Sequence, residues 1–420
     1  MDLQYMKRIK FYLNWLGSWP FEDLYEVYKE EPKRLPLRNS KILIIYFICI
    51  LLGGIMYVKV HKNELNFFEL GHNYITLLMN VVSLQRVTMA LLNSYRVMMA
   101  HFILNFHLFH HKHRSKYAMK IYKQIDTICS WYTIYLYSQM YVGCILFNLG
   151  PLINNIMSGA FESHAYSAEN GTAPEFEFSV YLYLPFTVQT KKQYGLISLL
   201  NILLTSDGAC IFCTFDVLMS IIIFHVWGHL KILKYHLESF PKPALAECEP
   251  GNSYTKVVMY TEDELPIIFE KLKENIEHHK LIIEFMNLAS NAFGVMICVY
   301  FIFHQVIGCI LLLEISAMDM ESFASYGVLT FVMFQQLIQI SIIFELIGSK
   351  SETIKHAVYD MPWECMDIKN KKIFLFFLSN VQKPIALKAM GLVSIGVQTM
   401  ASILKTSFSY FIMLRTLAEN

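Results

Sequence analysis

The chain has 420 residues, of which 55% are apolar and 16% charged, and its mean hydropathy is +0.38. Soluble domains carry about 25% charged residues, so this composition excludes an ordinary soluble enzyme and favours an integral membrane protein. Lysine and arginine number 35 against 34 acidic residues, and a net charge of +1 provides no basic surface for nucleic acid.

The amino-terminal segment is charged and precedes the first apolar run, at 42–58. No small-residue cleavage site follows that run, so we expect no cleaved signal peptide. The sequence contains nine cysteines, an odd number, and most of them lie inside apolar runs, so no disulfide framework is expected. We therefore predict a single membrane domain over residues 1–420.

A helix needs about 20 apolar residues to cross the hydrocarbon core, because lipid cannot satisfy backbone hydrogen bonds. Seven stretches fit this length: 41–60, 73–93, 127–150, 193–224, 285–313, 323–348 and 392–417. An eighth, 373–390, contains Lys383, Pro384 and Lys388, and we expect a half-inserted or cytosolic helix there. The predicted fold is an all-α integral membrane protein with seven transmembrane helices.

Positive residues set the predicted orientation, since Lys-rich and Arg-rich loops stay in the cytoplasm. Alternate segments (1–41, 94–126, 225–284 and 349–372) hold 26 Lys and Arg, whereas the opposite side holds 4. The amino terminus is thus predicted inside the cell and the carboxyl terminus outside. The sequon Asn170-Gly171-Thr172 falls in a predicted external segment, which makes Asn170 a candidate glycosylation site.

Two predicted spans continue beyond the length that a membrane requires. The fourth continues as a helical pattern toward Lys234 and His236, and residues 262–280 form an amphipathic pattern that leads into the fifth. We expect these extensions to form a cytosolic helical anchor layer that supports subunit assembly.

The carboxyl-terminal 60 residues carry the most specific motifs. Residues 359–363 read YDMPW, Pro384 precedes the last span, and that span contains TSFSYF at 406–411; YLPF occurs at 183–186. With the length and the inverted seven-span topology, these motifs resemble the insect odorant receptor family. The Gln-Phe ending usual in gustatory receptors is absent. The extended second cytoplasmic loop of the shared co-receptor is also absent, so the chain resembles a ligand-tuning subunit.

The resemblance implies an odorant-gated, nonselective cation channel in the plasma membrane of olfactory sensory neurons. Four subunits would surround one pore, and a tuning subunit would assemble with the odorant co-receptor. The family match places Met413, Thr416 and Leu417 at the constriction of a pore lined by the last helix, where an apolar ring can gate by dewetting. Arg415 departs from this pattern and is expected to extend to the membrane interface.

The resemblance also implies a small, mostly apolar odorant pocket in the outer half of the bundle, between spans two, three, four and six. Ordinary core packing is the competing interpretation for every candidate residue. The candidates are Leu77, Asn80, Ser138, Tyr141, Ile145, Tyr194, Ile197, Asn201, Val328 and Phe331.

Other residue patterns favour structural roles. The histidine-rich tract at 107–114 is interpreted as a solvated basic loop near anionic lipid rather than as a metal site, and Cys210 and Cys213 as packing residues. The pattern predicts no catalytic residues, cofactor or metal. Structural pairing is favoured over ion conduction for the ionisable residues within spans, which are Arg86, Asp207, Asp216, Glu284, His304 and Glu345. A gustatory-type receptor, and a transporter or membrane enzyme, stay open as alternatives.

Overall fold

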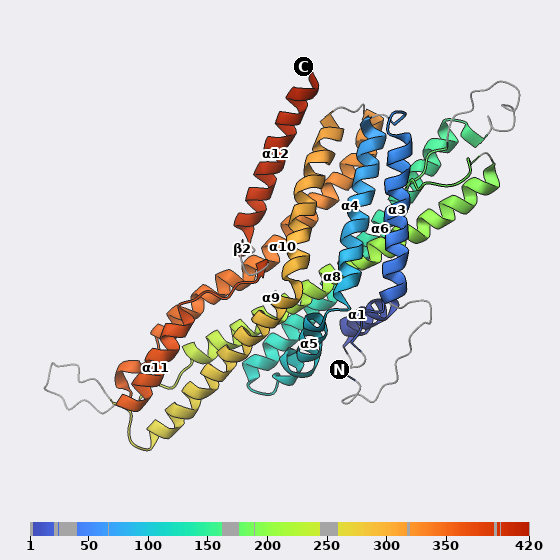
Figure 1. The fold of residues 1–420 in the computed structure, drawn as a ribbon. Coiled ribbons are helices and arrows are strands. Elements are labelled where there is room, and N and C mark those ends of the chain that lie inside the picture. Colours follow the sequence, from blue (N-terminus) through green and yellow to red (C-terminus); the bar gives the residue numbers. More distant parts are fainter. Residues whose placement is uncertain are drawn as a thin grey trace, which may run out of the picture.

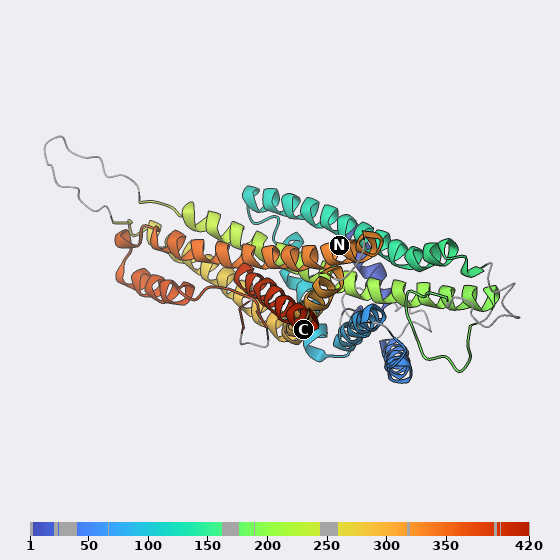
Figure 2. The same cartoon turned by 90° about the horizontal axis from the view of Figure 1, so that it is seen from above.

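The structure is a computed structural model. It describes residues 3–419 except 21–23, 25–39, 66, 162–175, 189, 244–258, 317–319, 390–392 and 395. The fold is helical, as predicted (Figures 1 and 2). Its α-helices are α1 (Gln4–Trp15), α3 (Ser40–His61), α4 (Phe67–Met89), α5 (Asn93–His101), α6 (Lys116–Met157), α8 (Lys191–Glu238), α9 (Glu264–Ser316), α10 (Met320–Tyr359), α11 (Ile368–Val381) and α12 (Val397–Glu419).

Short elements connect some of these helices. A π-helical turn, η1 (Phe102–Phe106), and two 3₁₀ turns, η2 (Leu108–His110) and η3 (Trp363–Cys365), lie between them. Two strands of two residues each, β1 (Lys388–Ala389) and β2 (Val393–Ser394), pair antiparallel just before α12.

A helix covers most of each predicted span. By length and composition, α3, α6, α8, α9 and the stretch Thr330–Cys365 are apolar enough to cross a membrane, and α4 together with the helical segment after its 66° bend makes a sixth candidate. The last helix, α12, does not reach the same apolar content because it carries Lys405, Thr406 and Arg415. Its membrane crossing therefore stays a prediction.

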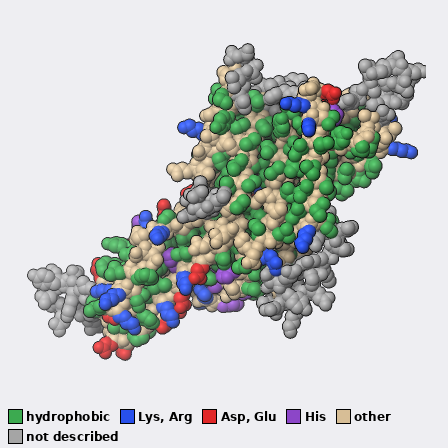
Figure 3. Space-filling view, viewed as in Figure 1, with side chains coloured by type: hydrophobic (Ala, Val, Ile, Leu, Met, Phe, Trp, Pro, Cys, Tyr) green, Lys and Arg blue, Asp and Glu red, His purple; other side chains and the backbone are tan. Residues whose placement is uncertain are grey.

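The helical pattern does continue beyond the fourth and fifth predicted spans. α8 is one helix of 48 residues and α9 one of 53, and together with α10 and α11 they project from the bundle as an arm (Figure 1). Charged side chains gather on this arm, whereas apolar side chains cover the face of the bundle above it (Figure 3). This distribution is the one expected of an apolar membrane region joined to a solvated extension.

The expected helix at 373–390 is shorter and starts earlier. α11 begins after Asp367, whose carboxylate accepts a hydrogen bond from the Asn370 backbone N–H, and it ends at Val381. Pro384 cannot continue a helix, and the chain turns into the β1–β2 hairpin instead. The final helix accordingly begins at Val397, five residues after the predicted start.

The prediction of a solvated loop at 107–114 is wrong for two of its histidines. His107 and His111 are buried, because η2 turns both side chains toward the core. The His107 ring bonds the Tyr5 hydroxyl at 2.7 Å, and the His111 ring donates to the Asn105 carbonyl oxygen at 2.8 Å. Within the described ranges, no group of three or more His, Cys, Asp or Glu side chains is arranged to hold a metal ion.

Candidate ligand-binding site and pore helix

An aromatic and polar cluster lies at the end of the bundle opposite the arm, where α4, α6 and α8 meet the segment 176–188. His72 of α4 lies parallel to Phe147 of α6, with ring centroids 5.8 Å apart. The same histidine donates to the Ser179 carbonyl oxygen at 2.9 Å, and its ring meets Tyr181 edge-on at 6.1 Å. One side chain thus joins two helices to the segment that covers them.

The amide side chains of Asn148 and Asn201 hold the covering segment, residues 176–188, against α6 and α8. Asn148 donates to the Thr205 hydroxyl at 2.8 Å and accepts from the Ser179 hydroxyl at 2.9 Å. Asn201 donates to the Val180 carbonyl oxygen at 3.0 Å, while its buried Oδ1 has no hydrogen-bond partner among the described residues. A buried acceptor without a donor costs about 1–3 kcal/mol, so this oxygen is a natural contact for a ligand donor.

Tyr194, Ile197 and Asn201 were all predicted for this site, and all three lie on the buried face of α8. Tyr194 packs on Phe176 and its hydroxyl accepts from the Asn155 amide at 3.1 Å. The spacing of the three residues, one turn apart, keeps them on a single face.

The candidates from α4 and α10 are distributed differently. Leu77 packs directly on α3, since a Cβ at Gly54 would lie 2.7 Å from its Cδ2, and Asn80 is half-buried. Phe331 is 71% exposed. Val328 lies in α10, but its side chain is outside the described residues.

The candidates from the third span lie outside the cluster. Ser138, Tyr141 and Ile145 occupy an exposed face of α6. The face directed at α8 carries Cys144 and Asn148 and is centred about 70° away around the helix. Polar residues spaced at i, i+4 in an apolar helix could have identified that face, because such residues avoid lipid.

The pore helix predicted from the sequence, α12, is attached to α9 by hydrogen bonds at its centre. The Gln305 side chain donates to the Ser407 hydroxyl at 3.1 Å and accepts from the Thr406 hydroxyl at 2.5 Å. A Cβ at Gly308 would lie 3.1 Å from the Ser407 hydroxyl oxygen, so the absence of a side chain there permits the close approach of the two helices. Two residues of the TSFSYF motif therefore serve to dock α12.

The two ends of α12 differ. At its start, the Val397 backbone N–H donates to the Glu345 carboxylate of α10 at 3.1 Å, which satisfies one unpaired donor of the first turn. Toward the other end, Met413 is 50% exposed and Thr416 is also exposed, its hydroxyl bonded to the Ile412 carbonyl oxygen. Leu417 lies in α12, but its side chain is outside the described residues.

The ionisable residues within the helices have structural partners. Arg86 is buried and pairs with Asp216 at 2.8 Å, and His304 bonds the Tyr300 carbonyl oxygen at 2.9 Å. The Glu345 carboxylate contacts α12 as described, and Glu284 pairs with Lys280 at 3.6 Å. Asp207 is half-buried, nine residues from Asp216. For Arg86 and Asp216 the expected structural pairing is confirmed.

Comparison with known sequences identifies the family to which the chain belongs. The sequence profile of the family described as "7tm Odorant receptor" matches residues 66–408. The chain belongs to the insect odorant receptor family. This confirms the resemblance seen in its carboxyl-terminal motifs, and the relatives of this odorant receptor are receptors rather than enzymes.

Curated relatives match over part of their length. Odorant receptor 67a of Drosophila melanogaster is 28% identical over 159 residues, which is 36% of this chain and 37% of that protein. Odorant receptor 22a of the same species is 24% identical over 234 residues, covering 54% of this chain and 53% of the relative. The matched stretches thus span about half or less of these receptors.

Solved structures match over nearly the whole chain. The insect olfactory receptor OR5 from Machilis hrabei superposes with a TM-score of 0.72 at 14% identity, covering 98% of this odorant receptor and 97% of that chain. The same receptor in complex with eugenol superposes with a TM-score of 0.69 at 14% identity, over 99% and 98% of the two chains. At this identity the match establishes the fold.

Proposed function

We propose that this odorant receptor is a ligand-tuning subunit of an odorant-gated, nonselective cation channel. It assembles with the odorant co-receptor into a heterotetramer in the plasma membrane of olfactory sensory neurons. Family membership and the fold shared with OR5 support this proposal. The complex of OR5 with eugenol supports a small organic molecule as the ligand class.

The proposed ligand site rests on one observation: the buried Oδ1 atom of Asn201 has no hydrogen-bond partner among the described residues. The covering segment next to it is tied to α6 and α8 by the amide hydrogen bonds. A small, largely apolar molecule with one hydrogen-bond donor fits such a site, because the donor pairs with Oδ1 and the rest displaces apolar surface from water. Leu77, Asn80, Tyr194 and Ile197 are proposed to contribute to its lining.

The gate is proposed at the exposed end of α12. A helix with an exposed apolar face is suited to contact the same helix of other subunits around a common axis. Met413, Thr416 and Leu417 would form the narrowest ring there. Ligand binding favours the open arrangement only through higher affinity for it.

The test is whole-cell current under an odorant panel, with the chain expressed alone and with an odorant co-receptor. Current that requires both chains and a ligand is expected. Asn201→Leu should weaken the response to donor-bearing odorants about tenfold, the worth of one buried hydrogen bond to a ligand. Ile202→Ala, on the exposed face of the same helix, is the matched control. Absence of current from surface-delivered chains would refute the channel proposal.

A further inference from the structure

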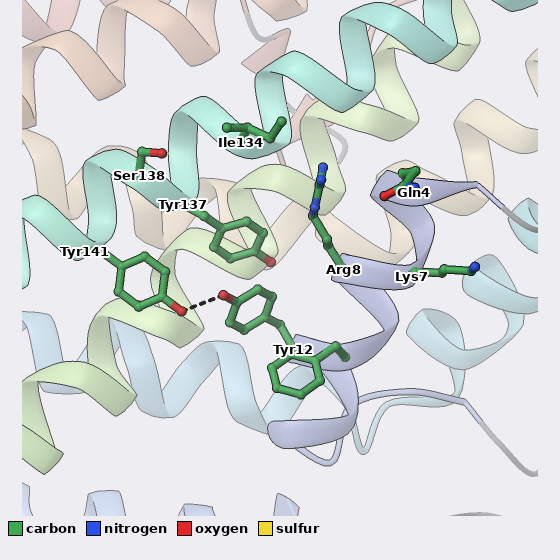
Figure 4. Close-up of a pocket in the computed structure, with 9 residues that line it drawn as sticks. Gln4, Lys7, Arg8, Tyr12, Ile134, Tyr137, Ser138 and Tyr141 are labelled. Carbon is green, nitrogen blue, oxygen red and sulfur yellow. Dashed lines mark hydrogen bonds between the residues drawn. The ribbon is translucent and has the colours of Figure 1, made fainter.

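A groove between α1 and the middle of α6 lies apart from the proposed odorant site. It has a volume of about 610 Å³ and is open to the surface (Figure 4). Tyr12 forms its wall on the α1 side, stacked on Tyr137 at 4.1 Å and hydrogen-bonded to the Tyr141 hydroxyl at 2.6 Å. The groove is therefore held by direct contacts between the two helices.

One end of the groove is cationic. Lys7 and Arg8 of α1 line it, and none of the nine lining side chains is acidic. The Arg8 side chain extends from α1 toward α6 (Figure 4), and its Nη1 atom is buried without a hydrogen-bond partner among the described residues. A guanidinium cannot lose its proton, so this nitrogen requires an acceptor, and an anionic oxygen supplies the strongest one.

Phe11, Ile134 and three tyrosine rings, together with Gln4 and Ser138, line the rest of the groove. The apolar part of this lining continues onto an exposed surface. Phe11 is 61% exposed, and Ile134 on α6 is also exposed. The outward face of α6 continues with exposed Trp131 and Ile145. Tryptophan and apolar side chains exposed in this way suit contact with lipid, whose chains can lie along the helix.

The helix α1 has the pattern of an interfacial helix. Its buried residues are Tyr5, Met6, Ile9 and Leu13, and Lys7 lies on the exposed side. Such helices lie at the membrane boundary with their basic side chains near anionic headgroups. The predicted cytoplasmic amino terminus would face the leaflet in which anionic lipids concentrate.

We propose that the α1–α6 groove binds one phospholipid with an anionic headgroup. Arg8 contacts the headgroup, and the acyl chains lie over Phe11, Ile134 and the outward face of α6. Both parts of this ligand are required by the groove, since a free anion leaves the apolar wall exposed and a neutral lipid leaves Arg8 without an anionic partner. The lipid then joins α1 to α6 at the level of Tyr12.

The test uses the purified full chain in detergent, with lipid binding read by native mass spectrometry and thermal stability. Phosphatidylserine is expected to bind about tenfold more tightly than phosphatidylcholine, and inorganic phosphate not to stabilise the protein. Arg8→Gln should abolish that preference, and Arg8→Lys should retain part of it. Lys10→Gln is the matched control, because it removes the same charge from α1 outside the groove.

Three results would overturn the proposal. Equal binding of the two lipids by the unaltered protein, which needs no variant to fold, would exclude headgroup recognition. Stabilisation by inorganic phosphate equal to that by phosphatidylserine would indicate a free-anion site. Equal loss in Arg8→Gln and Lys10→Gln would show that only net charge matters. None of these readouts depends on channel activity.

Discussion

The buried ion pair between Arg86 of α4 and Asp216 of α8 yields a sharp prediction. The two side chains are 2.8 Å apart, and the guanidinium also lies 3.9 Å from the Phe212 ring centroid and 5.6 Å from that of Tyr300 in α9. Arg86 has no exposed side-chain surface. The pair therefore holds three helices together in a region that water does not reach.

Replacing either Arg86 or Asp216 leaves the other side chain buried without its partner, but the two variants should lose different amounts of stability. In Asp216→Leu the guanidinium stays charged, since it cannot be deprotonated in a protein, and the expected cost is about 3–5 kcal/mol. In Arg86→Met the carboxyl group can take up a proton, so the cost is smaller. The double variant leaves no buried charge and should recover most of the loss, because apolar replacements of buried pairs are often near neutral.

The assay is the temperature at which the detergent-solubilised protein loses its monodisperse elution peak. Unfolding entropy scales with length, so for 420 residues a loss of 3–5 kcal/mol lowers this midpoint by about 3–6 °C. Glu284→Gln, which breaks the exposed pair with Lys280, should change it by less than about 1 °C. If the double variant loses as much as the two single variants together, the side chains are not coupled and the reasoning fails.

Three further predictions concern helix α12, the candidate ligand site and His111. Gln305→Leu removes both side-chain hydrogen bonds that dock α12 on α9, and should raise ligand-independent current several-fold; an unchanged current would show that other contacts hold α12. Asn148→Leu disconnects the covering segment at Ser179 and should shift odorant dose-response curves about tenfold to higher concentration, with Ile202→Ala unchanged. Burial lowers the pKa of His111 to about 4, so below pH 6.5 the unfolded chain binds more protons than the folded chain. The thermal midpoint should therefore decrease as the pH is lowered from 6.5 to 4. His111→Gln should show a flatter pH profile, and an equal slope would refute the assignment.

The sequence predicts long, regular elements of this fold well. Uninterrupted helical periodicity predicts the length of α8 and α9, and hence the projecting arm, because their backbone hydrogen bonds continue where no proline interrupts the pattern. The end of α11 is less predictable, although Pro384 marks it within a few residues. The hairpin before α12 has no turn motif in the sequence strong enough to predict it.

Side-chain direction is harder to predict than helix position. The outward placement of Tyr141 follows from the packing of α1 against α6, a contact between segments 129 residues apart that no local pattern encodes. His107 and His111 are buried because the Tyr5 hydroxyl and the Asn105 carbonyl oxygen of η1 provide partners that composition does not reveal. On α8, by contrast, Tyr194, Ile197 and Asn201 are placed on the buried face, since their spacing alone aligns them.

The continuity of α8 has a mechanical consequence. Its 48 residues form a rod of about 72 Å, and one end lies beside the covering segment while the other lies in the arm. A tilt of about 3° about the midpoint displaces each end by about 2 Å, the size of the helix shifts that accompany many allosteric transitions. Because α8 has no break that could absorb such a tilt, a small rearrangement around Asn201 would move the other end of the helix, in the arm, as a lever does.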